Sequence, residues 1–183
     1  YTLLPDTSGR VLIGGYFHSV DGVPTPPLAR LLPDGSVDPT FAFDAGFASL
    51  ITEVMPLADG RFLVRGDDWS SGVNQPKLTR IGADGARDTS FAPNLAAEFS
   101  LAAVAVAPGG KLVLAGELRS EGDAFSGRIF RVNADGSTDS SFDAGNSTAF
   151  DGGVTGVTAQ PDGKVVVVGW FSAFGGVPCP NIV

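Results

Sequence analysis

The stretch RVNADGSTDSSF contains the residues that most closely resemble a metal site, because Asn133 and Asp135 come just before Gly136 and a further carboxylate follows. Calcium loops of the EF-hand type place oxygen ligands at positions 1, 3 and 5, glycine at position 6 and a carboxylate at position 12. With Gly136 at position 6, Arg131 occupies position 1 and Phe142 occupies position 12. A cation and a phenyl ring cannot supply these two ligands, so the pattern excludes an EF-hand.

Catalytic and cofactor chemistry has little support elsewhere in the sequence. His18 is the only histidine and has no repeated carboxylate pair near it, which disfavours both acid–base catalysis and metal binding. Cys179 would need a nearby histidine to act as a nucleophile, so a buried or loop position is the better interpretation. Calcium bound through Asp143, Asn146 or Asp151 is a weak alternative, because a hard cation needs about six or more oxygen ligands. We therefore predict no catalytic residue, no metal site and no cofactor, in a protein that is not an enzyme.

The sequence motif around Gly136 occurs three times, so the chain contains an internal repeat. It reads RLLPDGSVDPTF, RIGADGARDTSF and RVNADGSTDSSF, and its turn aspartates Asp34, Asp84 and Asp135 are 50 and 51 residues apart. A second motif, GRVLIGG, recurs as GRFLVRG, GKLVLAG and GKVVVVG, with the copies starting at residues 9, 60, 110 and 163. This period of about 50 residues indicates one supersecondary unit repeated along the chain.

Each repeat consists of short strands joined by turns. Runs of four to eight β-branched and aliphatic residues bounded by Gly, Pro and Asp are typical of strands. In the second repeat LITEVMPL, RFLVRG, KLTRIG and ARDTSF are predicted as strands a, b, c and d. Four short strands in such a unit favour a β-propeller of four-stranded antiparallel blades over a β-solenoid or a sandwich.

The predicted propeller is incomplete in this chain. The expected repeat units cover approximately residues 1–49, 50–100, 101–152 and 153–183, of which the last is partial. About three and a half blades are fewer than the four to eight with which propellers typically close. We therefore expect a segment of a longer polypeptide, with sheet edges and an apolar blade face that something else must cover.

The turn between strands c and d can be predicted in detail. In LLPDGSVD, Pro33 and Asp34 suit the first two turn positions, and Gly35 supplies the positive φ of a type I turn followed by a G1 bulge. This loop pairs Leu32 with Ser36 and, two residues further out, places an arginine opposite an aspartate. The register predicts three cross-strand ion pairs: Arg30–Asp38, Arg80–Asp88 and Arg131–Asp139.

Composition and charge argue against a nucleic-acid partner and against a membrane span. The 25 glycines and 13 prolines among 183 residues suit an all-β domain that is dense in turns. The net charge is −8, and the three lysines (Lys77, Lys111 and Lys164) form no basic stripe that would bind nucleic acid. No apolar run approaches the roughly 18 to 20 residues that cross a bilayer, so we expect a soluble protein without a membrane span.

The two longest repeated patterns also resemble a known family. PDGKVVVVGWFSAFGGVP and LARLLPDGSVDPTF resemble the delta-60 repeat β-propellers of large bacterial proteins, and the resemblance covers essentially the whole chain. Many members are secreted or surface-attached, which implies an extracellular or cell-surface location here, with the periplasm as the alternative. The resemblance implies no established chemistry. VRGDDW and LAGELR, in the second and third repeats, depart from the pattern after strand b.

The loops that differ between repeats are the expected place for a specific contact. The a–b and c–d turns are closely similar, whereas the b–c and d–a connections vary, and these two pairs emerge on opposite faces of a propeller. The binding candidates in the b–c connections are Tyr16, His18, Asp67, Asp68, Trp69 and Trp170. The aromatic residues after strand b of the first and fourth repeats also suit a filling role between blades. Trp69, beside two aspartates, is the better ligand candidate.

Two functions agree with these observations. The first is a non-enzymatic secreted or cell-surface propeller for adhesion, scaffolding or protein interaction, whose partners are other envelope or extracellular proteins or the rest of its own propeller. The second is a carbohydrate-binding or carbohydrate-active propeller that contacts glycans through its variable loops. An enzyme should break the repeat with polar residues that face the channel. Glu53 is the one acidic residue found within a strand a, which is weak support, so the first function is favoured.

Overall fold

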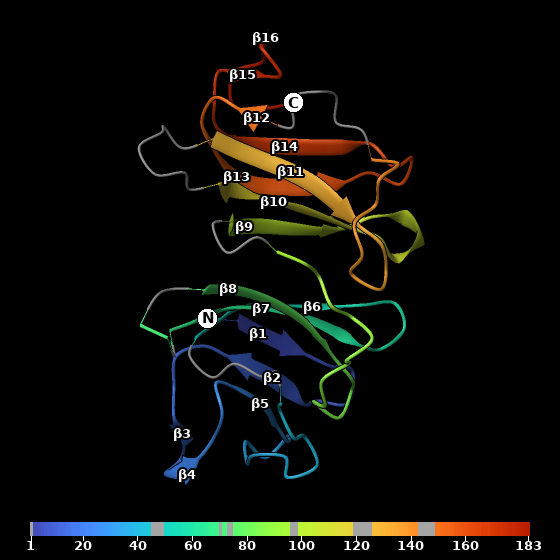
Figure 1. The fold of residues 1–183 in the computed structure, drawn as a ribbon. Helices are drawn as coiled ribbons and strands as arrows, with labels where there is room; N and C mark the ends of the chain where they lie inside the picture. Colours follow the sequence, from blue (N-terminus) through green and yellow to red (C-terminus); the bar gives the residue numbers. More distant parts are fainter. Residues whose placement is uncertain are drawn as a thin grey trace. The chain divides into compact units, whose positions relative to one another are not determined.

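The computed structural model shows an all-β chain organised as two compact units, Tyr1–Phe91 and Ala92–Val183 (Figure 1). The structure describes residues 2–44, 50–69, 71–72, 75–95, 99–118, 126–142 and 149–183. A 3₁₀ turn at Pro108–Gly110 interrupts the succession of strands. Within these residues no helix is long and apolar enough to span a bilayer.

The first unit contains two three-stranded antiparallel sheets, one for each of the first two repeats (Figure 1). Strands a, b and c of the first repeat are β1 (Thr2–Pro5), β2 (Val11–Gly14) and β5 (Leu28–Leu31), and those of the second are β6 (Leu50–Pro56), β7 (Phe62–Asp68) and β8 (Gln75–Ile81). In the first repeat a separate hairpin, β3 (Ser19–Val20) and β4 (Val23–Pro24), is formed by the b–c connection.

The second unit repeats this arrangement with one extension. Strands a to c of the third repeat are β9 (Phe99–Val106), β10 (Leu112–Leu118) and β11 (Ser126–Val132), and strands a and b of the fourth are β13 (Gly153–Ala159) and β14 (Val165–Trp170). The short strands β12 (Ala149–Phe150), β15 (Ala173–Phe174) and β16 (Val177–Pro178) add to β11, which gives a six-stranded sheet.

Strand d contributes little regular structure. The c–d turn has the predicted form, because the Leu32 amide donates to the Ser36 carbonyl at 2.8 Å and Gly35 has a φ of 86°. The pairing then stops at a single bridge between Leu31 and Val37. Asp38 Oδ1 accepts hydrogen bonds from the amide and hydroxyl groups of Thr40, and this local turn competes with a continued ladder. In each of the first three repeats strand d therefore adds a single bridge to strand c.

The repeats pack face to face in the same way in both units. The two sides of a blade alternate along its strands. We define the front face by the residues equivalent to Leu12 and Leu28, and the back face by those equivalent to Leu3, Ile13 and Leu31. In the first unit one buried cluster joins the front face of the first repeat to the back face of the second: Leu12, Leu28 and Phe41 pack with Ile51, Val54, Val64 and Ile81.

The second unit follows this packing rule. Ile129, on the front face of the third repeat, shares a buried cluster with Val167 on the back face of the fourth. Val113, also on the front face of the third repeat, packs with Val165. Burial of an aliphatic side chain of this size contributes about 1.5–3 kcal/mol to stability. Blade stacking is therefore a main source of stability within each unit.

Candidate functional site

The c–d hairpin of the first repeat holds an almost fully buried ion pair. Nε of Arg30 lies 2.8 Å from Oδ2 of Asp38, and both side chains have little solvent exposure. The two other nitrogens of the guanidinium donate to the Ala83 carbonyl at 2.7 Å and to the Thr40 hydroxyl at 3.2 Å. The guanidinium also lies over the ring of Phe41. All three nitrogens of Arg30 are thus engaged by the protein itself.

The same ion pair is present in the next two repeats. Arg80 lies 2.8 Å from Asp88, and Arg131 lies 2.6 Å from Asp139. In all three repeats the guanidinium stands over the closing phenylalanine, at 5.0, 4.9 and 4.7 Å from the ring centroid. The aspartate that follows each turn glycine therefore binds an arginine, and its resemblance to a calcium ligand in the sequence has a structural explanation.

A second cation, from the start of strand b, joins the aspartate in the second and third repeats. Nη1 of Arg61 lies 2.5 Å from Oδ2 of Asp88, and Nζ of Lys111 lies 2.7 Å from Oδ2 of Asp139. Each of these carboxylates thus bridges two strands of its own sheet through charge-assisted hydrogen bonds.

These contacts keep the aspartates ionised. The Thr40 hydroxyl and amide, followed by Arg30, lower the pKa of Asp38 from 3.8 to about 2. The pKa of Asp88 is lowered by the Ser90 hydroxyl and then by Arg80 and Arg61, and that of Asp139 mainly by Lys111 and the Ser141 hydroxyl. A general acid or base works best with a pKa near the ambient pH. These carboxylates are therefore poor candidates for acid–base catalysis at neutral pH.

A cavity of about 230 Å³ lies between the sheets of the first unit. Its walls are mainly apolar and include Leu12 of the first repeat and Phe62 of the second. Arg10, also in the lining, is held by Asp6 at 2.9 Å, and Arg30 makes the contacts described above. The cavity thus combines an apolar wall with charged groups that already have partners.

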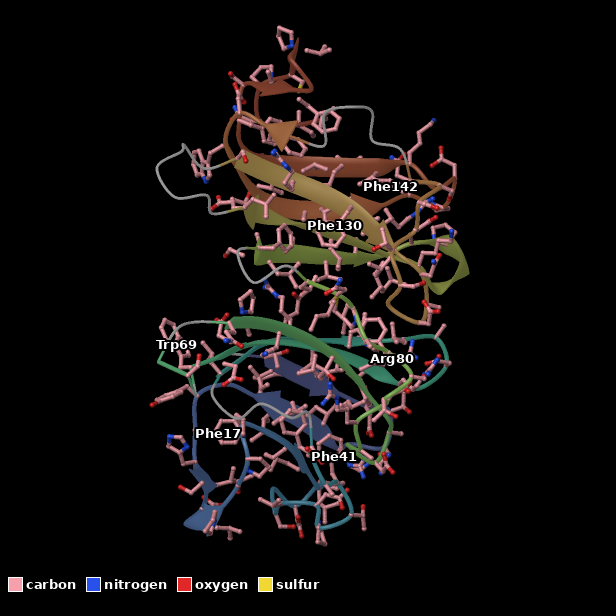
Figure 2. The ribbon with its side chains drawn as sticks, in the orientation of Figure 1. Phe17, Phe41, Trp69, Arg80, Phe130 and Phe142 are labelled. Carbon is pink, nitrogen blue, oxygen red and sulfur yellow. The ribbon has the colours of Figure 1, made fainter. Side chains whose placement is uncertain are left out.

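The b–c connections carry exposed aromatic side chains. Trp69 follows the end of β7 at the edge of the first unit and is 53% exposed (Figure 2). Tyr16 is also mostly exposed, and its ring meets that of His18 edge-on at a centroid distance of 5.3 Å. These three candidate residues lie in the connections after β2 and β7.

The two aspartates beside Trp69 do not form a joint carboxylate site. Asp67 and Asp68 are the last residues of β7, so their side chains leave the strand on opposite sides. Asp68 is buried, and Asp67 is partly buried. A ligand at the Trp69 loop would therefore meet the indole ring more readily than a pair of carboxylates.

The aromatic pair after strand b of the fourth repeat has two different environments. Phe171 is buried, with its ring centroid 4.5 Å from that of Phe150, as expected for a residue that fills a gap between strands. Trp170 is 80% exposed. The filling role proposed for both residues from the sequence applies to Phe171, whereas Trp170 is available for contact.

The remaining polar candidates have structural contacts where the structure describes them. Asp151 accepts hydrogen bonds from the amides of Ser172 and Ala173 and from the Ser172 hydroxyl, whereas Asp143 and Asn146 lie outside the described residues. Within the described ranges no group of three or more His, Cys, Asp or Glu side chains is arranged to hold a metal ion.

Glu53 and Cys179 also have neighbours that explain their presence. The carboxylate of Glu53 lies 3.1 Å from Nε of Arg65 on the adjacent strand, which gives this acidic residue a cross-strand ionic partner. Cys179 is partly buried and packs against the cluster that contains Phe150, consistent with the expected buried or loop position.

Two sets of residues that contact the hairpin aspartates were not predicted from the sequence, although the sequence contains a signal for each. Each aspartate after the turn is followed two residues later by a hydroxyl residue: Thr40, Ser90 or Ser141. The repeated pattern Asp-x-Ser/Thr is typical of a local turn in which the carboxylate accepts two hydrogen bonds. The basic residue after the glycine of GRFLVRG and GKLVLAG was the corresponding signal for the second cation.

Comparison with known proteins agrees with the observed strands. One family, described as "Domain of unknown function (DUF5122) beta-propeller", matches residues 7–41, 57–91, 108–142 and 160–183, which together exceed half of the chain. The first three matched segments run from the turn before strand b to the closing phenylalanine of their repeat, and the fourth begins at the same turn. No curated protein matches the sequence significantly.

Proposed function

Because the chain belongs to the DUF5122 β-propeller family, whose own function is unknown, we propose that it is a non-enzymatic protein-interaction module. In this proposal it serves adhesion or scaffolding within a larger bacterial protein or assembly. Its partners are other envelope or extracellular proteins, and it binds no nucleic acid. The delta-60 resemblance supports an extracellular or cell-surface location.

One observation carries the proposal. The repeated charged residues form ion pairs within their own hairpins, whereas the exposed aromatic residues lie in the loops that differ between repeats. Arg30, Arg80 and Arg131 each bind an aspartate of their own hairpin. Exposed Trp69 and Tyr16 lie in connections that differ from one repeat to the next. Recognition is commonly placed on loops held by a rigid scaffold, and aromatic residues are enriched at interfaces.

Carbohydrate binding is the second candidate function, and it has a specific observation in its favour. Trp69 presents an exposed indole two residues after Asp67 in the sequence, and a flat apolar ring together with a hydrogen-bond acceptor suits a sugar ring. In this version the ligand is a glycan of the cell envelope, and the same loop surface binds it.

The test is a binding screen of the immobilised chain against bacterial envelope proteins and against an array of envelope glycans. We expect specific binding to a protein, reduced at least about tenfold by Trp69→Ala or Tyr16→Ala. Lys164→Ala is the control, because Lys164 is an exposed residue of an a–b turn and does not belong to a b–c connection. Binding that is confined to glycans would favour the second candidate. Release of glycan fragments would overturn the non-enzymatic assignment, and unchanged binding by both loop variants would overturn the surface assignment.

A further inference from the structure

The cavity of the first unit is lined by apolar side chains from two repeats that face each other. Leu4 and Leu12 belong to the front face of the first repeat, and Phe62 belongs to the back face of the second. Leu12 is buried and the other two are partly buried. The charged residues Asp6 and Arg10 line the same cavity. An apolar wall with a few polar groups is the usual composition of a small-molecule site.

Arg10 keeps two donor nitrogens that the described part of the chain does not use. Its Nε donates to Oδ2 of Asp6 at 2.9 Å, whereas Nη1 and Nη2 make no hydrogen bond within the described residues. Arg30, the other cation in the lining, uses all three of its guanidinium nitrogens in the contacts described above. Two open N–H groups on one planar guanidinium match the two oxygens of a carboxylate. The free hydrogen-bonding capacity at Arg10 therefore favours an anion.

Asp6 is already committed to hydrogen bonds within its own turn. Oδ1 accepts from the amide and hydroxyl of Ser8 and from the amide of Arg10, and Oδ2 accepts from the Arg10 side chain. These hydrogen bonds, of which that from the Ser8 hydroxyl has the largest effect, lower the pKa of Asp6 from 3.8 to about 2. An ionised Asp6 with its oxygens engaged does not favour a cationic ligand, and its charge disfavours a dianion such as a phosphate monoester. A single negative charge suits the site best.

The second repeat shows that an arginine at this position can hold two carboxylates at once. Arg61, the equivalent of Arg10, binds Asp59 of its own a–b turn through Nε and Nη2 and binds Asp88 through Nη1. Among the described residues Arg10 has one carboxylate partner, Asp6. A second carboxylate can therefore bind Arg10 without displacing the first.

The equivalent place in the second unit is filled by side chains. Ala107 stands at the position of Asp6, because the amide of each donates to the carbonyl of the residue four positions later. Ala107 packs in a buried cluster with Val113, at the position of Leu12, and with residues of the fourth repeat. A charged residue cannot complete such an apolar cluster without a large desolvation cost. The cavity therefore depends on a residue, Asp6, in which the first repeat differs from the third.

We propose that this cavity binds a small monocarboxylic acid, with its carboxylate on Nη1 and Nη2 of Arg10 and its hydrocarbon part against Leu4, Leu12 and Phe62. The cavity volume of about 230 Å³ lies below the roughly 300 Å³ at which sites for drug-sized ligands begin, so the acid is small. Burial of its hydrocarbon part supplies affinity, and the guanidinium supplies selectivity for the charged group.

This site goes beyond the proposed function and uses other residues. Tyr16 and Trp69 do not line the cavity. Trp69→Ala should therefore weaken partner binding and leave acid binding unchanged, whereas a substitution of Arg10 should do the reverse. Failure of one proposal is thus distinguishable from failure of the other.

Titration of the isotope-labelled chain with hexanoate, followed by NMR, tests the inference. We expect saturable chemical-shift changes at the amides of Leu4, Arg10, Leu12 and Phe62. Acetate has the carboxylate with almost no hydrocarbon, and hexanol has the hydrocarbon chain without the charge. Each should therefore bind at least about tenfold more weakly than hexanoate.

Substitutions of Arg10 give the second measurement. Arg10→Gln should weaken hexanoate binding at least about tenfold, and Arg10→Lys, which keeps the charge but loses the paired donors, should give an intermediate affinity. Arg87→Gln is the matched control, because Arg87 is exposed and does not line the cavity. The Arg10–Asp6 pair is largely exposed, so circular dichroism and thermal unfolding should show that all three variants are folded.

Four results would overturn the inference. They are the absence of saturable shifts with hexanoate, shifts confined to residues outside the cavity, equal affinity for hexanol and hexanoate, and equal weakening of binding by Arg87→Gln and Arg10→Gln.

Discussion

The first and second repeats share the ion pair of the c–d hairpin but differ in the cation at the start of strand b. Arg61 reaches Asp88, whereas the equivalent Arg10 binds Asp6 and leaves Asp38 with Arg30. The position of Asp6 is occupied by a leucine in the second repeat. Arg61 also pairs with Asp59 of its own a–b turn at 2.6 Å, so the two repeats differ in the position of the acidic residue, which lies four residues before Arg10 and two residues before Arg61.

The largest expected effect in this comparison is loss of the arginine from the hairpin. Arg30→Met should reduce the free energy of unfolding more than any other substitution in this comparison, because Asp38, which has little solvent exposure, would lose its cation. Arg80→Met should cost less, because Arg61 still neutralises Asp88. Urea unfolding of both variants measures the difference. Equal losses would contradict a supporting role for Arg61.

The second prediction compares equivalent back-face residues of the second and first repeats, one fully buried and one partly buried. Ile81→Ala should destabilise by about 2–5 kcal/mol, because Ile81 is fully buried between blades. Leu31→Ala, at the equivalent position of the first repeat, should cost less than half as much, because Leu31 is only partly buried. Chemical denaturation followed by tryptophan fluorescence provides both values. Similar costs would contradict the difference in burial between these two positions.

The third prediction concerns acid stability. The folded-state pKa of Asp38 is lowered from 3.8 to about 2, so its ionised form stabilises the fold above about pH 4, and this contribution is lost as the pH falls toward 2. The difference in unfolding free energy between the unsubstituted protein and Asp38→Asn should be constant near neutrality and shrink below pH 4. A difference that stays unchanged down to pH 2 would show that the charge of Asp38 is not responsible.

The smallest expected effect is that of Asp6→Leu, which gives the first repeat the residue type of the second. Arg10 would then be free to reach Asp38, as Arg61 reaches Asp88. Because the Arg10–Asp6 pair is largely exposed, stability should change little. The pKa of Asp38, followed by NMR titration, should fall further, because a second cation would stabilise its ionised form. An unchanged or raised pKa would mean that another feature of the turn holds Arg10 away.

The sequence predicts most accurately those contacts that lie within one hairpin. Arg30 and Asp38 are eight residues apart around a turn whose glycine dictates the register, so their pairing follows from local geometry. Arg61 and Asp88 are separated by two strands, and their contact depends on how the whole sheet closes. Strand d was predicted from its composition, but the Asp-x-Ser/Thr turn limits it to one bridge.

The candidate site shows the same division between local and long-range information. The exposed loop position of Trp69 follows from its place after a strand and before a glycine. The different environments of Trp170 and Phe171 do not follow from their types, because both are aromatic and adjacent. Whether each ring is buried depends on which strand packs beside it. The sequence of a single repeat does not reveal this.

The most direct test of this account compares the affinity of Asp38→Asn and Trp69→Ala for a partner obtained from the binding screen, at a temperature where both variants are folded. The account predicts that Asp38→Asn is less stable but retains the affinity of the unsubstituted chain, whereas Trp69→Ala is equally stable and binds at least about tenfold more weakly. The opposite result, with affinity lost through Asp38 and retained without Trp69, would place recognition at the repeated charged hairpins and contradict their structural role.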